Sequence, residues 1–95
     1  MTEAVLYIAS KCRACKEVQP IVLELFETWS IPLVVRKPSL RELQNLRIHG
    51  YPALLLPFIQ PPVLLAGSEM ASWLREHEVE VRDGYRISNR QCHCS

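Results

Sequence analysis

The sequence predicts a mixed α/β fold in which a four-stranded sheet is flanked by helices on both faces. Short apolar runs alternate with amphipathic stretches, in an order that indicates a βαβ unit followed by a ββα unit. A strand–helix–strand crossover is right-handed and makes its two strands parallel, whereas a short turn makes the later pair an antiparallel hairpin. With 95 residues, 48% of them hydrophobic, the chain has enough apolar side chains for one core.

The first half of the chain predicts two strands and the helix between them. Residues 4–9 are almost continuously apolar, so this strand is expected to be buried on both faces. Pro20 falls inside the helix and is expected to kink its axis, at a cost of about 3 kcal/mol. A second strand is predicted over residues 31–35, where Pro32 suits the first residues of a strand. Helical spacing predicts the apolar face of the helix, formed by Ala14, Val18, Ile21, Val22, Leu25, Phe26 and Trp29.

The second half predicts a helix, a strand pair and a final helix. Ser39 and Glu42 fit a capping box, so a helix is expected to begin at Ser39. Strands are predicted over 53–56 and 63–66, joined by a turn. Ser68 is expected to cap the last helix. The residues expected to point inward from the two helices are Leu40, Leu43, Leu46, Met70, Trp73 and Leu74.

The C-terminal stretch predicts an appended element. Residues 79–87 alternate around Asp83-Gly84, which is a strong signal for a two-residue β-hairpin. Residues 88–95 are polar and contain Cys92-His93-Cys94. We therefore expect a domain over residues 1–78 and an extension over 79–95, made of a hairpin and a Cys-His-Cys tail.

Charge and hydropathy exclude several classes of protein. The 11 basic and 10 acidic residues give a net charge of +1, which does not favour a nucleic-acid partner. No apolar run approaches the ~20 residues of a membrane-spanning helix. Residues 1–3 lack the basic region of a signal peptide. We therefore expect a cytoplasmic protein with no membrane partner, and in that reducing compartment a cysteine pair is more often catalytic or metal-binding than structural.

Cys12 and Cys15 lie at the predicted junction between the first strand and the first helix. One helical turn brings their sulfurs within bonding range, so the pair suits reversible thiol–disulfide chemistry. The helix N-terminus and the nearby charges of Lys11, Arg13 and Lys16 are expected to lower the pKa of Cys12 from ~8.5. We therefore predict that Cys12 is the nucleophile and that Cys15, one turn further along, resolves the mixed disulfide.

Two segments resemble the thioredoxin family. Residues 12–25 are similar to the thioredoxin active-site helix, with a lysine after the second cysteine and a proline four residues further on. Residues 47–56 resemble the segment that holds the cis-proline opposite the disulfide. The resemblance implies that Tyr51–Pro52 is cis, that Pro52 leaves neighbouring backbone groups free to pair with an extended substrate, and that it keeps metal off the thiolates. Tyr51 either lines the substrate groove or covers the core.

The compact layout and residues 7–11 are more similar to glutaredoxins. Residues 67–69 stand where glutaredoxins bind the γ-glutamyl carboxylate of glutathione. The resemblance covers roughly residues 4–77 and implies a thioredoxin fold and a thiol–disulfide oxidoreductase that reduces protein disulfides. It implies no resident cofactor or metal, and electrons supplied by glutathione or a thioredoxin reductase. The implied substrate-binding residues are Lys11, Arg13, Tyr51, Pro52, Gly67 and Ser68.

Two other functions remain open from the residues. Three interpretations of Cys92 and Cys94 stay open: a second redox relay, two unstructured thiols, or a zinc or iron–sulfur site shared with Cys12 and Cys15. A third class is an adaptor of the same fold in which the cysteines are incidental. Disulfide exchange and bound metal distinguish these alternatives.

Overall fold

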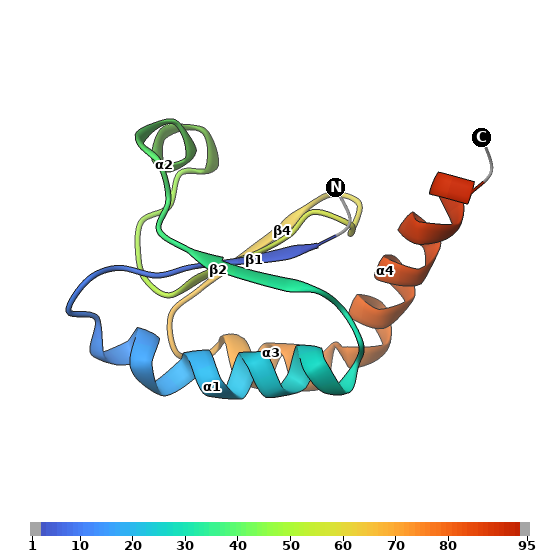
Figure 1. Ribbon diagram of the computed structural model, residues 1–95, viewed down its shortest axis with the longest axis horizontal. Coiled ribbons are helices and arrows are strands. Elements are labelled where there is room, and N and C mark those ends of the chain that lie inside the picture. The colour runs from blue at the N-terminus through green and yellow to red at the C-terminus, as the bar shows by residue number, and fades with distance from the viewer. Residues whose placement is uncertain (1–2, 94–95) are drawn as a thin grey trace.

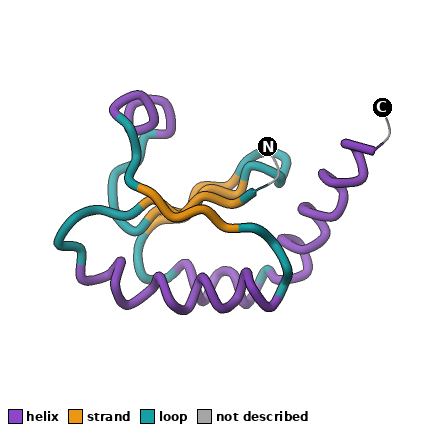
Figure 2. The backbone as a smooth tube through the Cα atoms, viewed as in Figure 1, coloured by secondary structure: helices purple, strands orange, loops and turns teal. Residues whose placement is uncertain are grey.

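The four predicted strands form one sheet, with two helices on one side and a short helix on the other (Figures 1 and 2). The last helix starts on the side of the two helices and extends past the end of the sheet. The structure, a computed structural model, describes the backbone of residues 3–93 and the side chains of residues 3–88. The elements are, in chain order, β1 (Ala4–Tyr7), α1 (Arg13–Thr28), β2 (Leu33–Arg36), α2 (Leu40–Leu46), β3 (Ala53–Leu56), β4 (Val63–Ala66), α3 (Met70–Glu76) and α4 (Glu78–His93).

The strand order in the sheet is β2-β1-β3-β4. β1 pairs with β2 in parallel, and β3 pairs with both β1 and β4 in antiparallel orientation. Tyr7, the last residue of β1, therefore lies beside Arg36 on one neighbouring strand and Ala53 on the other. The predicted parallel pair and the predicted hairpin are confirmed, and the topology is that of a thioredoxin-like fold.

The larger core lies between the sheet and the helices α1, α3 and α4. Leu6, Leu54 and Leu56 face it from the sheet, and Phe26 is fully buried against them. The inward face predicted for α1 is largely confirmed, although Ile21 remains 37% exposed. Burying such a continuous apolar stripe fixes α1 along the sheet, and so fixes the position of its first turn.

A smaller core covers the opposite face of the sheet. Val5, Tyr7, Ala53 and Leu55 form it, together with residues from α2 and the segment after it. The predicted capping box at the start of α2 is confirmed, because Ser39 Oγ accepts from the Glu42 N–H at 3.2 Å and Glu42 Oε1 accepts from the Ser39 N–H at 3.0 Å. Helices therefore cover both faces, as predicted.

The predicted hairpin over residues 79–87 is wrong, because these residues belong to α4. Val81 is fully buried and Tyr85, one turn on, packs edge-on against Phe58 with ring centroids 5.4 Å apart. Gly84 does not form a turn: a Cβ there would lie 3.2 Å from Ile59 Cγ1, so the glycine lets α4 approach the 57–62 loop closely. Packing at helical spacing has overridden the local Asp-Gly turn signal.

The predicted cap at Ser68 is also wrong. Glu69 occupies the N-cap position of α3, with no side-chain hydrogen bond, and Ser68 is exposed. The chain enters α3 through Gly67, whose φ of +86° favours glycine, and this left-handed turn leaves Ser68 one residue too early to cap the helix. Within residues 3–93, no helix has both the length and the apolar character needed to cross a membrane.

Candidate functional site

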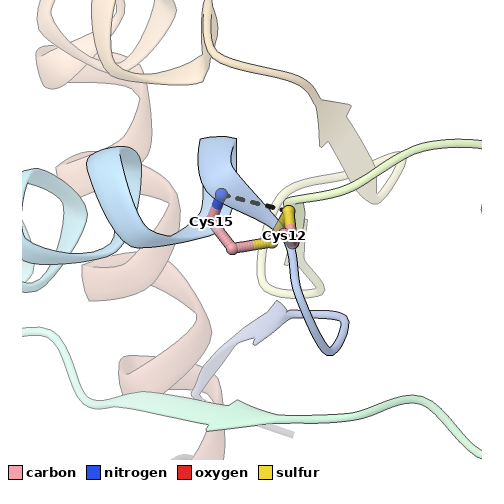
Figure 3. The surroundings of a disulfide bond; sticks show 2 residues. All are labelled: Cys12 and Cys15. Atoms are coloured by element: carbon pink, nitrogen blue, oxygen red, sulfur yellow. Dashed lines mark hydrogen bonds between the residues drawn. A yellow bond between two sulfur atoms is a disulfide. The ribbon is translucent and has the colours of Figure 1, made fainter.

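Cys12 and Cys15 lie at the first turn of α1, just beyond the end of β1 (Figure 3). Cys12 is the N-cap residue, with an extended backbone at φ −102° and ψ 108°. Its Sγ accepts a hydrogen bond from the Cys15 N–H at 3.1 Å. The two residues form a disulfide with Cα atoms 5.2 Å apart, inside the range that such a bond spans. The predicted position of the pair at a strand-to-helix junction is confirmed.

The two sulfurs differ in their access to solvent. Cys15 is 3% exposed, whereas Cys12 is partly exposed. A thiolate at Cys12 would keep the N–H bond from Cys15 and lie at the positive end of a sixteen-residue helix. The geometry therefore suits an accessible nucleophile at Cys12 and a protected second thiol at Cys15.

Three exposed cations surround this turn. Lys11, in a left-handed conformation with φ 55°, precedes Cys12, and Lys16 follows Cys15. The side chain of Arg13 is 93% exposed and its Nε lies 3.3 Å from Glu17 Oε1. Such exposed charges add little to folding stability, but they give the surface around the disulfide a positive charge.

The segment around Pro52 lies at the same edge of the sheet. Ala53 pairs with Tyr7, so Pro52 lies beside the point where the chain leaves β1 for Cys12. The Tyr51–Pro52 peptide bond is cis, as the resemblance implied, and Pro52 is buried. Its carbonyl accepts from the Gly67 N–H at 2.9 Å, which brings the start of α3 to this edge. Tyr51 packs partly buried against the smaller core.

A polar cluster that the sequence analysis missed lies next to this edge. Glu42 Oε2 accepts from the Tyr7 hydroxyl at 2.7 Å, and Glu42 Oε1 accepts from Arg36 Nη1 at 2.7 Å. The Arg36 guanidinium also lies over the Tyr7 ring, 5.3 Å from its centroid. The capping box identified Glu42 itself, but its partners depend on strand register. The cluster ties α2 to the ends of β1 and β2.

The cluster shifts the pKa values of its members in opposite directions. Hydrogen bonds from Arg36, the Ser39 backbone and Tyr7 lower the pKa of Glu42 to about 2. Burial first, and then the neighbouring Glu42 carboxylate, raises the pKa of Tyr7 to about 12. The hydrogen bond to Glu42 likewise raises the pKa of Arg36. Glu42 is therefore ionised and Tyr7 is protonated across the physiological range.

The C-terminal cysteine motif falls largely outside the residues that the structure describes. Figure 1 shows the far end of α4 at the end of the molecule opposite the first turn of α1. The side chain of Cys92 and all of Cys94 lie outside the described residues. In the part of the chain that the structure describes, no group of three or more metal-ligating side chains is assembled.

No protein-family model matches this chain, and a search of curated proteins finds no match to it. The thioredoxin-like fold and the Cys12–Cys15 disulfide are compatible with redox chemistry.

Proposed function

We propose that this protein is a thiol–disulfide oxidoreductase that reduces protein disulfides through Cys12 and Cys15. The observation that carries the proposal is the Cys12 sulfur at the N-cap of α1, bonded to the buried Cys15 and accepting its backbone N–H. Such a sulfur is stabilised as a leaving group and as a thiolate.

The reaction starts from the reduced dithiol. The Cys12 thiolate attacks one sulfur of the substrate disulfide, the substrate S–S bond breaks, and the released substrate thiolate takes a proton from water. Cys15 then loses its proton and attacks Cys12 Sγ, which releases the second substrate thiol and forms the Cys12–Cys15 disulfide. Two electrons pass from the protein to the substrate. Leu6 is fully buried and stands where thioredoxins have an acid, so the proton of Cys15 passes to water or to the departing substrate thiolate.

We assign substrate positioning to the residues around the same edge. Pro52 has no N–H, which leaves neighbouring backbone groups free to pair with an extended substrate. Lys11, Arg13, Tyr51, Gly67 and Ser68 complete the proposed binding surface. Glutathione or a thioredoxin reductase would return two electrons to the disulfide, and we propose that this takes place in a reducing compartment, the cytoplasm.

The trapping of the mixed disulfide tests this function. In a background with Cys92→Ser and Cys94→Ser, the Cys15→Ser variant retains the nucleophile but lacks the resolving thiol. We expect it to form a stable covalent adduct with an oxidised model protein, visible by intact mass and reversed by dithiothreitol. The matched Cys12→Ser variant retains only the buried thiol and is expected to form little adduct. If Cys15→Ser forms no adduct, or if Cys12→Ser forms as much, the proposed roles are contradicted.

A further inference from the structure

The net charge of +1 conceals a strong separation of charge along the molecule. Three segments, 8–17, 36–52 and 66–69, contain seven of the 11 Lys and Arg residues and only three of the 10 Asp and Glu residues. The rest of the chain contains four basic and seven acidic residues. We call the first set of segments the disulfide edge. The basic residues of the disulfide edge are Lys11, Arg13, Lys16, Arg36, Lys37, Arg41 and Arg47.

Contacts in the structure bring these three segments together. Tyr7 and Arg36 are register partners at the ends of β1 and β2, and Lys37 Nζ donates to Ser10 Oγ at 2.8 Å. The bond from the Gly67 N–H to the Pro52 carbonyl joins the third segment. Figure 1 shows the loops of this edge at one end of the sheet and α4 at the other. Most of the basic residues therefore lie toward the end of the sheet at which α1 begins with the disulfide.

We propose that the disulfide edge selects acidic protein segments, so that the preferred substrates carry Asp and Glu beside their disulfide. This inference rests on the proposed function and specifies the substrate class of the same site. Exposed charges of one sign raise the local concentration of oppositely charged partners and their rate of association, more than the strength of binding. Arg13 and Lys16 lie in the first turn of α1, directly after the N-cap Cys12, and both are exposed.

The observations favour an acidic protein over a nucleic acid. Single-stranded nucleic acids bind on exposed aromatic platforms between the cations. Tyr7 at this edge is 1% exposed, and Tyr51 packs against the smaller core. Arg36 is already paired with Glu42, whereas the contact of Arg13 with Glu17 is exposed to solvent and weak. The exposed cations that are not tightly paired are therefore suited to attract separate Asp and Glu carboxylates beside a substrate disulfide.

A single-turnover kinetic experiment tests the inference. The full chain with Cys92→Ser and Cys94→Ser is reduced, separated from reductant and mixed with disulfide peptides that differ only in flanking glutamates, serines or lysines. At low salt we expect the glutamate peptide to react about tenfold or more faster than the lysine peptide. The difference should shrink strongly in about 1 M salt, where the Debye length falls to about 3 Å.

Charge-reversal variants locate the effect. In the double variant Arg13→Glu with Lys16→Glu, we expect the glutamate peptide to react no faster than the serine peptide. The ratio of the two rates is used because any change in the intrinsic reactivity of the sulfur affects both rates equally. The matched control, Arg75→Glu with Arg86→Glu, changes the net charge equally but lies on α3 and α4, and should leave the ratio nearly unchanged. An equal loss in both variants would overturn the inference, because it would reflect net charge alone.

The remaining outcomes separate the inference from the proposed function. If the protein reduces the uncharged 2-hydroxyethyl disulfide and the three peptides at similar rates, the function stands and the acidic preference is wrong. If it reduces none of these disulfides, the proposed function itself fails. If a mixed-sequence single-stranded oligonucleotide inhibits the reaction as strongly as excess glutamate peptide does, the surface does not select acidic protein segments.

Discussion

α1 and α4 are both sixteen-residue amphipathic helices, yet among the side chains that the structure describes (up to residue 88), those of α1 are buried over far more of the helix. α1 buries Cys15, Val18, Val22 and Phe26, spaced over nearly its whole extent. α4 buries Val81 near its start, while Val79 is 71% exposed and Ile87 is 55% exposed. The difference indicates that continuous burial against the core, rather than length or amphipathicity, holds the first turn of α1, and Cys12 with it, in place.

The two helices also differ in what stabilises them. α4 has exposed ion pairs along its surface, Glu78–Arg82 at 3.0 Å and Asp83–Arg86, each worth only a few tenths of a kcal/mol. α1 has one such exposed pair, Arg13–Glu17, but it also buries four side chains along its length and has a cap at Cys12. Mutations should therefore affect the two helices to different extents.

The largest effect is expected at the centre of α1. Phe26 is fully buried and its ring lies 5.4 Å from that of Trp29. Phe26→Ala should lower the free energy of unfolding by about 3–5 kcal/mol, measured by urea denaturation. Leu23→Ala, on the exposed side of the same helix, is the control and should cost less than about 1 kcal/mol. Equal costs would contradict the continuous docking of α1.

The corresponding test in α4 is Val81→Ala. Val81 is fully buried and belongs to the same core as α1, so its loss should cost about 1–3 kcal/mol. Val79→Ala, two residues earlier and exposed, should change stability by less than about 0.5 kcal/mol. If both variants are neutral in urea denaturation, α4 is not anchored to the core at all.

The cluster of Tyr7, Glu42 and Arg36, on the side of the sheet that α2 covers, should make the free energy of unfolding depend on pH. The pKa of Glu42 is lowered to about 2 from 4.5, so its stabilisation is complete above 4.5 and is lost as the pH falls towards 2. The pKa of Tyr7 is raised to about 12 from 10.0, so its stabilisation is complete below 10 and is lost as the pH rises through 12.

Glu42→Gln should therefore cost about 1–2 kcal/mol at neutral pH and flatten the acid side of the stability profile. Tyr7→Phe should flatten the alkaline side and weaken the acid dependence less than Glu42→Gln does, because the Arg36 and Ser39 bonds to Glu42 remain. Thermal unfolding between pH 2 and 12 measures both. An unaltered acid side in Glu42→Gln would show that another carboxylate carries the acid dependence.

The smallest effect is expected at Gly84, where two opposing contributions nearly cancel. Alanine has a helix propensity about 1 kcal/mol better than glycine, but its Cβ would lie 3.2 Å from Ile59 Cγ1. We expect Gly84→Ala to remain within about 1 kcal/mol of the original protein, whereas Gly84→Leu should lose about 1–3 kcal/mol by overpacking. A clearly stabilised Gly84→Leu would contradict the close approach of α4 to the 57–62 loop.

Local signals predicted much of the fold. Continuous apolar runs predicted the bounds of β3 and β4, and the Ser39–Glu42 pattern predicted the cap of α2. The hairpin prediction failed at Asp83-Gly84 because the pattern alone could not reveal that Phe58 and Ile59 lie against that stretch. Helical packing there depends on a loop some twenty-five residues earlier in the chain.

The candidate site, like the fold, was predictable where it depends on residues close together in the chain. The apolar run before Cys12 and the helical spacing after it placed Cys12 at the helix start, and the structure adds the hydrogen bond from the Cys15 N–H. The Tyr7–Glu42–Arg36 cluster was not predictable, since it requires the register of β1 with β2 and the position of α2 above both. The concentration of charge at the disulfide edge likewise emerges only after folding, because its segments are far apart in the chain.

The most direct test is the redox equilibrium of Cys12 and Cys15 in glutathione buffers, with Cys92→Ser and Cys94→Ser to leave a single pair. We predict a reversible two-electron transition with a midpoint between about −270 mV, a thioredoxin-like value, and about −200 mV, a glutaredoxin-like value. A midpoint below about −300 mV would indicate a structural disulfide. Failure to form any disulfide would contradict the redox function and would make metal analysis of the unmodified chain the next experiment.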